Sequence, residues 1–219
     1  METVRFYYDP VSPYAWLATK AIARIEAAGV HLEMEPVLFA AILGAHGLKG
    51  PAEIPAKREL MVRDVLRLAA AGGLTFRGPP GHPFNPLLAL RMCLAIGSLA
   101  GRRRFTFTLS EACWERGLDI SNPAVLLQLA AECDLNGAAL QGAARTSEIK
   151  AALRDATERA IEAGVFGVPT FGYAGELFWG SDRIDLLLRR IAGQRIDEQR
   201  LQDFLARPPL ATREEGSAG

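Results

Sequence analysis

The chain has 219 residues, of which 49% are hydrophobic and 23% are charged, and its 25 Lys and Arg balance 25 Asp and Glu. This composition is typical of an ordinary globular protein and excludes disordered, collagenous and coiled-coil chains. Zero net charge argues against a nucleic-acid partner, because proteins that displace counterions from nucleic acid carry a basic excess.

The first forty residues predict a βαβ unit. Residues 3–8 (TVRFYY) are a short β-branched and aromatic run that favours a strand. Residues 13–28 have the apolar period of a helix, with Gly29 as its stop, and residues 31–38 alternate like a second strand. A crossover of this kind joins parallel strands with a right-handed connection.

From about residue 40 to residue 164 the sequence favours helices, with little that reads as strand. The expected helices cover residues 55–71, 87–99, 103–115, 123–133 and 147–163. Residues 76–86 (FRGPPGHPFNP) hold four prolines and two glycines, so we expect an irregular loop there.

Strand character returns near the end of the chain. Residues 169–173 and 176–179 predict a hairpin, and a last helix follows through about residue 192. This order of elements predicts an α/β, thioredoxin-like fold. We expect the thioredoxin-like domain in residues 1–40 and 165–206, a large all-helical insertion in residues 41–164, and a mobile tail in residues 207–219.

Ser12 lies where the first expected strand turns into the first expected helix. Thioredoxin-like redox proteins carry a Cys-x-x-Cys at this place, where the helix dipole and free backbone N–H groups stabilise a thiolate. This chain has no cysteine there. Taken alone, Ser12 is typical of a helix N-cap, with Pro13 at the first helical position.

Two further motifs occur near the late strands. Val168-Pro169 stands where thioredoxin-like folds have a cis peptide, which leaves the backbone before the proline free to pair with an extended peptide. The alternative is a proline that merely opens an edge strand. Ser181 and Asp182 begin the last helix, where they can cap it or bind a charged group.

Together, YDPVSPYAW, GVFGVPTF and ELFWGSDR resemble the 2-hydroxychromene-2-carboxylate isomerases. These are glutathione-dependent members of the DsbA-like thioredoxin group and are related to kappa-class glutathione transferases. The resemblance covers about residues 3–195, including IPAKRELMVRD and HPFNPLLALR. It implies an isomerase that uses glutathione as cofactor and interconverts 2-hydroxychromene-2-carboxylate and trans-o-hydroxybenzylidenepyruvate in naphthalene-type degradation. Relatives commonly dimerise, so a homodimer is expected.

The resemblance also implies roles for individual residues. Ser12 matches the catalytic serine, whose hydroxyl keeps the glutathione sulfur as a thiolate. The implied glutathione-binding residues are Ser12, Lys57, Val168, Trp179, Gly180, Ser181 and Asp182, and the implied substrate residues are Tyr14, Phe84 and Asn85. Many relatives have an asparagine before the IPAK element, whereas this chain reads GLKGPAEIP, which leaves open whether a contact is lost or moved there.

Two other functions stay open. A kappa-like glutathione transferase or peroxidase would use the same Ser12 on other electrophiles. A non-catalytic thioredoxin-fold binding module would hold a peptide at the Val168-Pro169 edge. A disulfide oxidoreductase is disfavoured because no cysteine lies near Ser12 in the sequence.

The remaining features receive no functional role. Cys93, Cys113 and Cys133 have neither disulfide nor zinc spacing and are expected to be buried. His31, His46 and His82 show no metal-ligand spacing, so no metal site is expected, and Trp114 is interpreted as packing. Because no signal peptide or span of about 20 apolar residues is visible, we expect a soluble cytoplasmic protein without membrane contacts, acting on a small aromatic carboxylate.

Overall fold

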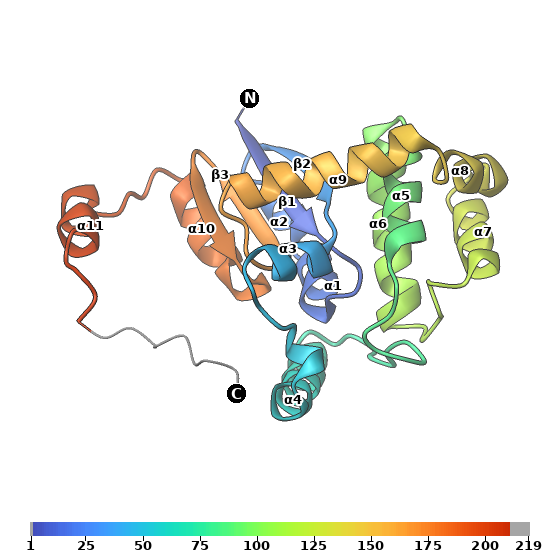
Figure 1. Ribbon diagram of the computed structural model, residues 1–219, viewed down its shortest axis with the longest axis horizontal. Coiled ribbons are helices and arrows are strands. Elements are labelled where there is room, and N and C mark those ends of the chain that lie inside the picture. The colour runs from blue at the N-terminus through green and yellow to red at the C-terminus, as the bar shows by residue number, and fades with distance from the viewer. Residues whose placement is uncertain (1, 211–219) are drawn as a thin grey trace, which may run out of the picture.

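The computed structural model describes residues 2–210 and has a mixed four-stranded sheet with the order β2-β1-β3-β4. β1 (Thr3–Tyr8) pairs in parallel with β2 (His31–Pro36). β3 (Thr170–Tyr173) is antiparallel both to β1 and to β4 (Glu176–Trp179). The sheet therefore combines strands from both ends of the chain, with helices between them in sequence, as the sequence predicted (Figure 1).

One face of the sheet is covered by α1 (Pro13–Thr19), α2 (Ile22–Glu26) and α10 (Ile184–Ile191). Val4, Phe6 and Tyr8 all point to this face, because side chains alternate along a strand. The ring of Phe6 stacks on that of Phe171, with centroids 4.8 Å apart. This packing fixes the end of β1, from which the turn toward α1 leaves.

The opposite face is covered by α3 (Phe39–Ala45) and α9 (Ser147–Glu162). Tyr7 and Val168 are buried here together with Ile42 and Ala160. α9 runs past the sheet toward α5 (Leu87–Ala95) and contacts both the sheet and that helix (Figure 1). The expected division of the chain at residues 41 and 164 stays a prediction.

A second core lies among the helices between β2 and β3. Apart from α3 and α9, these helices are η1 (Pro51–Glu53), α4 (Pro55–Ala71), α5 (Leu87–Ala95), α6 (Leu99–Trp114), α7 (Pro123–Glu132) and α8 (Gly137–Ala143). Trp16 of α1 is buried in this core, and its Nε1 donates to Glu115 Oε1 at 2.8 Å. The first helix is therefore anchored in both cores. Cys93, Cys113 and Cys133 are buried, as the sequence predicted.

The prediction of one helix over residues 13–28 is wrong. α1 ends at Thr19, whose hydroxyl donates to the carbonyl of Trp16 at 2.6 Å, and α2 begins at Ile22. A threonine hydroxyl that bonds to its own helix competes with the regular backbone pattern. The periodic apolar residues continue across this break, which explains why the sequence pattern hides it.

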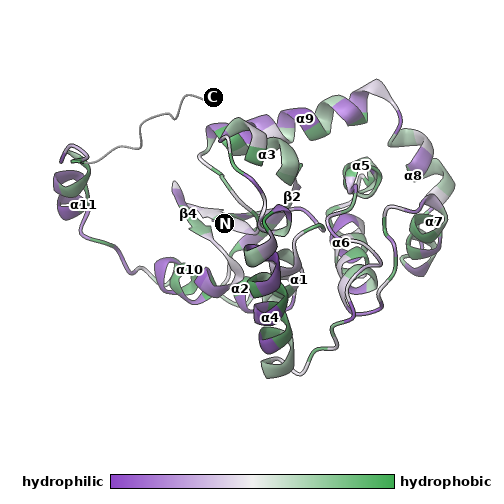
Figure 2. Cartoon of the chain, turned by 60° about the horizontal axis from the view of Figure 1, so that its bottom comes forward, coloured by the Kyte–Doolittle hydropathy of each residue, from purple (hydrophilic) through white to green (hydrophobic). Residues whose placement is uncertain are grey.

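Other boundaries also differ from the prediction. α6 begins at Leu99 rather than at residue 103, because Ser98 caps it by accepting from the N–H of Gly101 at 3.1 Å. α3, α8 and α11 (Glu198–Leu205) were not expected. α11 stands apart from the other helices in both views (Figure 1 and Figure 2). Of the expected mobile tail, residues 211–219 lie outside the described residues. None of the helices in residues 2–210 is long and apolar enough to cross a membrane.

Candidate functional site

Ser12 is the centre of the candidate site and is only 7% exposed. Its Oγ accepts from the backbone N–H of Ala15 at 3.3 Å, so it caps α1 as the sequence predicted. The same hydroxyl donates to the carbonyl oxygen of Val168 at 3.2 Å. The Val168–Pro169 peptide is cis, also as predicted. Two motifs that are far apart in the sequence thus meet at one hydroxyl.

The turn that leads into Ser12 is held by side chains from distant parts of the chain. Nε1 of Trp114 donates to the carbonyl of Pro10 at 3.0 Å, and Nε2 of His82 lies 2.8 Å from the carbonyl oxygen of Val11. Neither residue was assigned to the site from the sequence. Nothing in their spacing could have indicated it, because both contacts arise only when the helical segment packs on the turn.

Asp9 lies beneath this turn and is fully buried. Its Oδ1 accepts from the N–H of Val11 at 2.9 Å and its Oδ2 from the N–H of Phe39 at 3.0 Å. Burial raises the pKa of Asp9 to about 7, against the opposing effect of these two hydrogen bonds. The site therefore contains a carboxyl group that ionises near neutral pH.

Tyr14 connects α1 with α4. Its hydroxyl donates to Asp64 Oδ2 at 2.9 Å. Burial, the hydrogen bond to Asp64 and the negative charges of Asp64 and Asp182 all raise the pKa of Tyr14. The phenol therefore stays protonated, in the neighbourhood of both Ser12 and Asp182. Lys57 is exposed in the first turn of the same helix α4.

Trp179 forms an aromatic wall beside the cis proline loop. It is 54% exposed, and its ring meets that of Phe166 edge-on with centroids 4.8 Å apart. The indole also lies over Gly167, where a Cβ would overlap it. An exposed tryptophan held in one place in this way offers a rigid contact surface for a ligand.

β4 is followed by a short turn that presents Ser181 and Asp182. Gly180 has a φ of +108° and the carboxylate of Asp182 takes the space of its missing Cβ, so only glycine fits there without strain. η2 (Ser181–Arg183) then begins, and the exposed Asp182 pairs with Arg183 at 2.5 Å. The N–H of Gly180 donates to the carbonyl of Pro169 at 2.9 Å, which fixes this turn beside the cis proline.

An aromatic cluster contacts the turn before Ser12 through the carbonyl groups of Pro10 and Val11. It consists of Trp16, Phe76, His82, Phe84 and Trp114, whose successive rings lie between 5.4 and 6.3 Å apart. Phe84 contacts His82 in this cluster, and its role toward the substrate stays a prediction. Asn85 is exposed, and its Oδ1 accepts from the N–H of Leu87, the first residue of α5, at 3.0 Å. Within residues 2–210, no hydrogen bond or ion pair joins Asn85 or Lys57 to Ser12, so their roles stay predictions.

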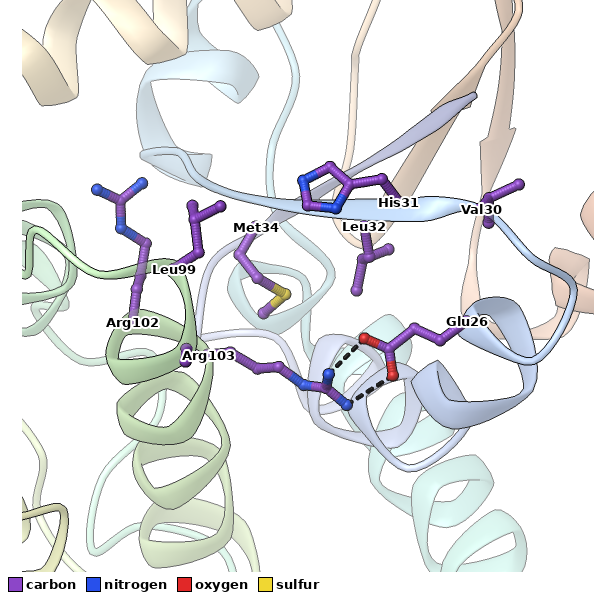
Figure 3. A pocket seen from close by; sticks show the side chains of 9 residues that line it. Glu26, Val30, His31, Leu32, Met34, Leu99, Arg102 and Arg103 are labelled. Carbon is purple, nitrogen blue, oxygen red and sulfur yellow. Dashed lines mark hydrogen bonds and ion pairs between the residues drawn. The ribbon is translucent and has the colours of Figure 1, made fainter. Parts of the chain in front are cut away.

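A cavity of about 260 Å³ lies elsewhere, between β2 and the start of α6 (Figure 3). Its charged side chains already have partners. Arg103 pairs with the carboxylate of Glu26, and Arg102 donates to the carbonyls of Cys93 and Ile96 at 3.1 and 3.2 Å. The remaining polar side chain at this cavity is the imidazole of His31, which has no catalytic partner beside it among the lining residues (Figure 3). No cluster of metal-ligating side chains occurs in the part of the chain that the structure describes.

Residues 3–192 match the family described as the DSBA-like thioredoxin domain, and the chain belongs to this family. The predicted fold class and family resemblance are thereby confirmed. Human glutathione S-transferase kappa 1 is 28% identical over 207 residues, which cover 84% of this chain and 88% of that protein. The 2-hydroxychromene-2-carboxylate isomerase of Sphingobium xenophagum is 27% identical over 191 residues, covering 85% and 96%. A solved structure of a 2-hydroxychromene-2-carboxylate isomerase has a TM-score of 0.81 at 21% identity, covering 94% of this chain and 100% of that one.

Proposed function

We propose that this protein is a glutathione-dependent isomerase that interconverts 2-hydroxychromene-2-carboxylate and trans-o-hydroxybenzylidenepyruvate. The observation that carries the proposal is the contact between the Ser12 hydroxyl and the carbonyl before the cis proline, in a turn without any cysteine. Burial raises the pKa of Cys93 to about 11 and raises that of Cys113 as well, so these thiols stay protonated. Because Cys133 is buried as well, a thiol nucleophile beside Ser12 would have to be supplied from outside the chain.

Two parts of the site fit glutathione: Ser12 and Val168 suit its cysteinyl part, and the turn around Asp182 suits its γ-glutamyl end. A hydroxyl hydrogen rotates freely, so the hydrogen that Ser12 now directs at Val168 can turn toward a sulfur. That rotation frees the Val168 carbonyl to accept an amide N–H from the ligand. The exposed Asp182 carboxylate suits an α-ammonium, and Trp179, Gly180 and Ser181 form the surface beside it.

Bound glutathione would supply the thiol nucleophile. The contribution of Ser12 is to donate a hydrogen bond to the sulfur, which favours the thiolate and lowers the pKa of the thiol. Phe76 and Phe84, the half-buried phenylalanines of the aromatic cluster, offer an apolar surface for an aromatic substrate, and the protonated Tyr14 offers a hydroxyl donor. Lys57 is the cation proposed for a carboxylate. The homodimer, the cytoplasmic location and the place in naphthalene-type degradation stay predictions.

An activity assay separates the candidate functions. The purified protein is mixed with 2-hydroxychromene-2-carboxylate with and without glutathione, and we expect conversion that depends on glutathione. Absence of glutathione-stimulated conversion would contradict the proposal. The 28% identity to human glutathione S-transferase kappa 1 favours a transferase as second candidate. Turnover of chlorodinitrobenzene far above the isomerase rate would support that candidate. Tight peptide binding at the Val168-Pro169 edge without any glutathione-dependent rate would support a binding module.

Replacing Asp182 with Asn is expected to raise the KM for glutathione about fivefold and to change kcat less than about twofold, because an exposed ion pair contributes roughly 1 kcal/mol. Steady-state kinetics with varied glutathione measure both constants. Asp185→Asn is the matched control, since Asp185 is also exposed and pairs with Arg24 at 2.6 Å. Equal effects of the two substitutions would exclude a specific role for Asp182.

A further inference from the structure

We propose that His82, together with Trp114, is a positioning residue that orients Ser12 through the carbonyl groups of the preceding turn. The inference rests on the proposed function, in which the Ser12 hydroxyl meets the glutathione sulfur. It adds a role for the helical segment between β2 and β3, which supplies both rings.

Two consecutive peptide planes in this turn are each held at both ends. In the first plane, the carbonyl of Pro10 accepts from Trp114 at 3.0 Å, and the N–H of Val11 donates to Asp9 Oδ1 at 2.9 Å. In the second, the carbonyl of Val11 lies 2.8 Å from the His82 ring, and the N–H of Ser12 donates to the backbone carbonyl of Asp9 at 3.0 Å. Because a peptide group is planar, holding its two ends fixes its orientation.

The contact to the carbonyl of Val11 also defines which ring nitrogen of His82 carries the hydrogen. A carbonyl oxygen only accepts hydrogen bonds, so Nε2 of His82 carries the hydrogen and donates it. Burial, and then the positive charge of Arg58, lower the pKa of His82, although the hydrogen bond to Val11 acts in the opposite direction. The ring is therefore neutral at neutral pH. It is held edge-on against Trp114, with ring centroids 5.4 Å apart.

The position of the Ser12 hydroxyl depends on this turn. Its Oγ must satisfy both the N–H of Ala15 and, 3.2 Å away, the carbonyl of Val168. A misplacement of about 1 Å can cost about 100-fold in rate when a group must meet a reacting atom. Loss of the His82 hydrogen bond would leave one end of the second peptide plane free, directly before Ser12. His82 therefore acts on the thiol through Ser12 and not by touching it.

Two substitutions at position 82 separate the hydrogen bond from the ring. His82→Gln places an N–H donor close to the position of Nε2, whereas His82→Leu keeps similar bulk without a donor. In His82→Leu we expect kcat/KM to fall about 30-fold, and the pKa of bound glutathione to rise toward its value in water. In His82→Gln, kcat/KM should stay within about threefold of wild type, and the thiol pKa within about 0.5 unit, which is the same factor. The thiol pKa is measured from the ultraviolet absorbance of the thiolate in the enzyme–glutathione complex.

The same substitutions in a Ser12→Ala background show whether His82 acts through Ser12. Since the hydroxyl is then absent, His82→Leu should lower kcat/KM by less than about twofold further and shift the thiol pKa by less than about 0.3 unit. A full additional loss in this background would overturn the inference, as would equal losses in His82→Leu and His82→Gln. Equal losses of kcat/KM in the two variants, accompanied by equal losses of melting temperature, would indicate a role in stability alone and would likewise overturn the inference.

A measurement without glutathione keeps this inference separate from the proposed function. Nitrogen NMR of the histidine rings in the free protein is expected to show His82 as the neutral Nε2–H tautomer. The amide signals of Ser12 and Tyr14 should shift in His82→Leu and stay in place in His82→Gln. An Nδ1–H tautomer, or unchanged amide signals in His82→Leu, would overturn the inference. Failure of the wild type to bind glutathione would instead contradict the proposed function.

Discussion

Ser12→Ala is expected to lower kcat for the glutathione-dependent isomerisation by about 100-fold or more. The reason is that Ser12 supplies the hydroxyl donor proposed to stabilise the thiolate, and removing one such donor typically costs a factor of about 100 to 1,000. The substitution also removes the hydrogen bond that caps α1. Loss of a cap costs about 1 kcal/mol of stability, which a protein of this size tolerates. Steady-state kinetics at saturating glutathione, together with a melting curve, measure the two effects separately.

Thr146→Ala is the matched control for Ser12→Ala. Thr146 caps α9 by accepting from the N–H of Ile149 at 3.4 Å, and it belongs to no part of the candidate site. Its replacement should cost a similar free energy of unfolding and leave kcat unchanged. A Ser12→Ala enzyme that retains more than half of the wild-type kcat would exclude the proposed role of the hydroxyl.

The free energy of unfolding is expected to fall by about 3 kcal/mol between about pH 5 and about pH 8 because of Asp9 alone. The pKa of this carboxyl is raised from 3.8 in an unperturbed chain to about 7 in the fold. Between these values the folded state holds a proton that the unfolded state has released, so raising the pH favours unfolding. Well above pH 7 both states are ionised, and the contribution stops changing. Urea unfolding at a series of pH values measures the slope.

Asp9→Asn removes the titrating group while keeping its shape. Asparagine has a single acceptor oxygen, so either Val11 or Phe39 loses the partner of its N–H, and we expect a less stable protein at low pH. The pH dependence assigned to Asp9 should nevertheless disappear. The same loss of stability with rising pH in wild type and variant would show that another group is responsible.

The sheet and most helices could be predicted from the sequence because their signals are local. The alternation in residues 31–36, the apolar period of residues 55–71 and the turn at Ala174-Gly175 each depend on neighbouring residues. The break between Thr19 and Ile22 could not be predicted in this way. It depends on a single hydroxyl that bonds back to Trp16, in a segment whose apolar period continues unbroken.

The residues of the candidate site likewise fall into those that local sequence motifs predict and those that only the folded structure reveals. Ser12 and Val168-Pro169 stand in recognisable motifs, and their contact follows from the order of elements in the fold. His82 and Trp114 reach the turn from 71 and 104 positions away, respectively, along the chain. Asp9 is part of a recognised motif, yet its raised pKa is a consequence of burial, which depends on the finished fold. Such residues are identified only once the helical segment is seen against the turn.

The central claim is that Ser12 stabilises the thiolate of bound glutathione. Its most direct test is a pH titration of the ultraviolet thiolate absorbance of glutathione bound to the wild-type protein, with free glutathione as reference. A bound thiol whose pKa lies at least about 1 unit below that of free glutathione is the result expected from a hydroxyl donor at the sulfur. A bound thiol that titrates at the same pH as free glutathione would contradict the claim.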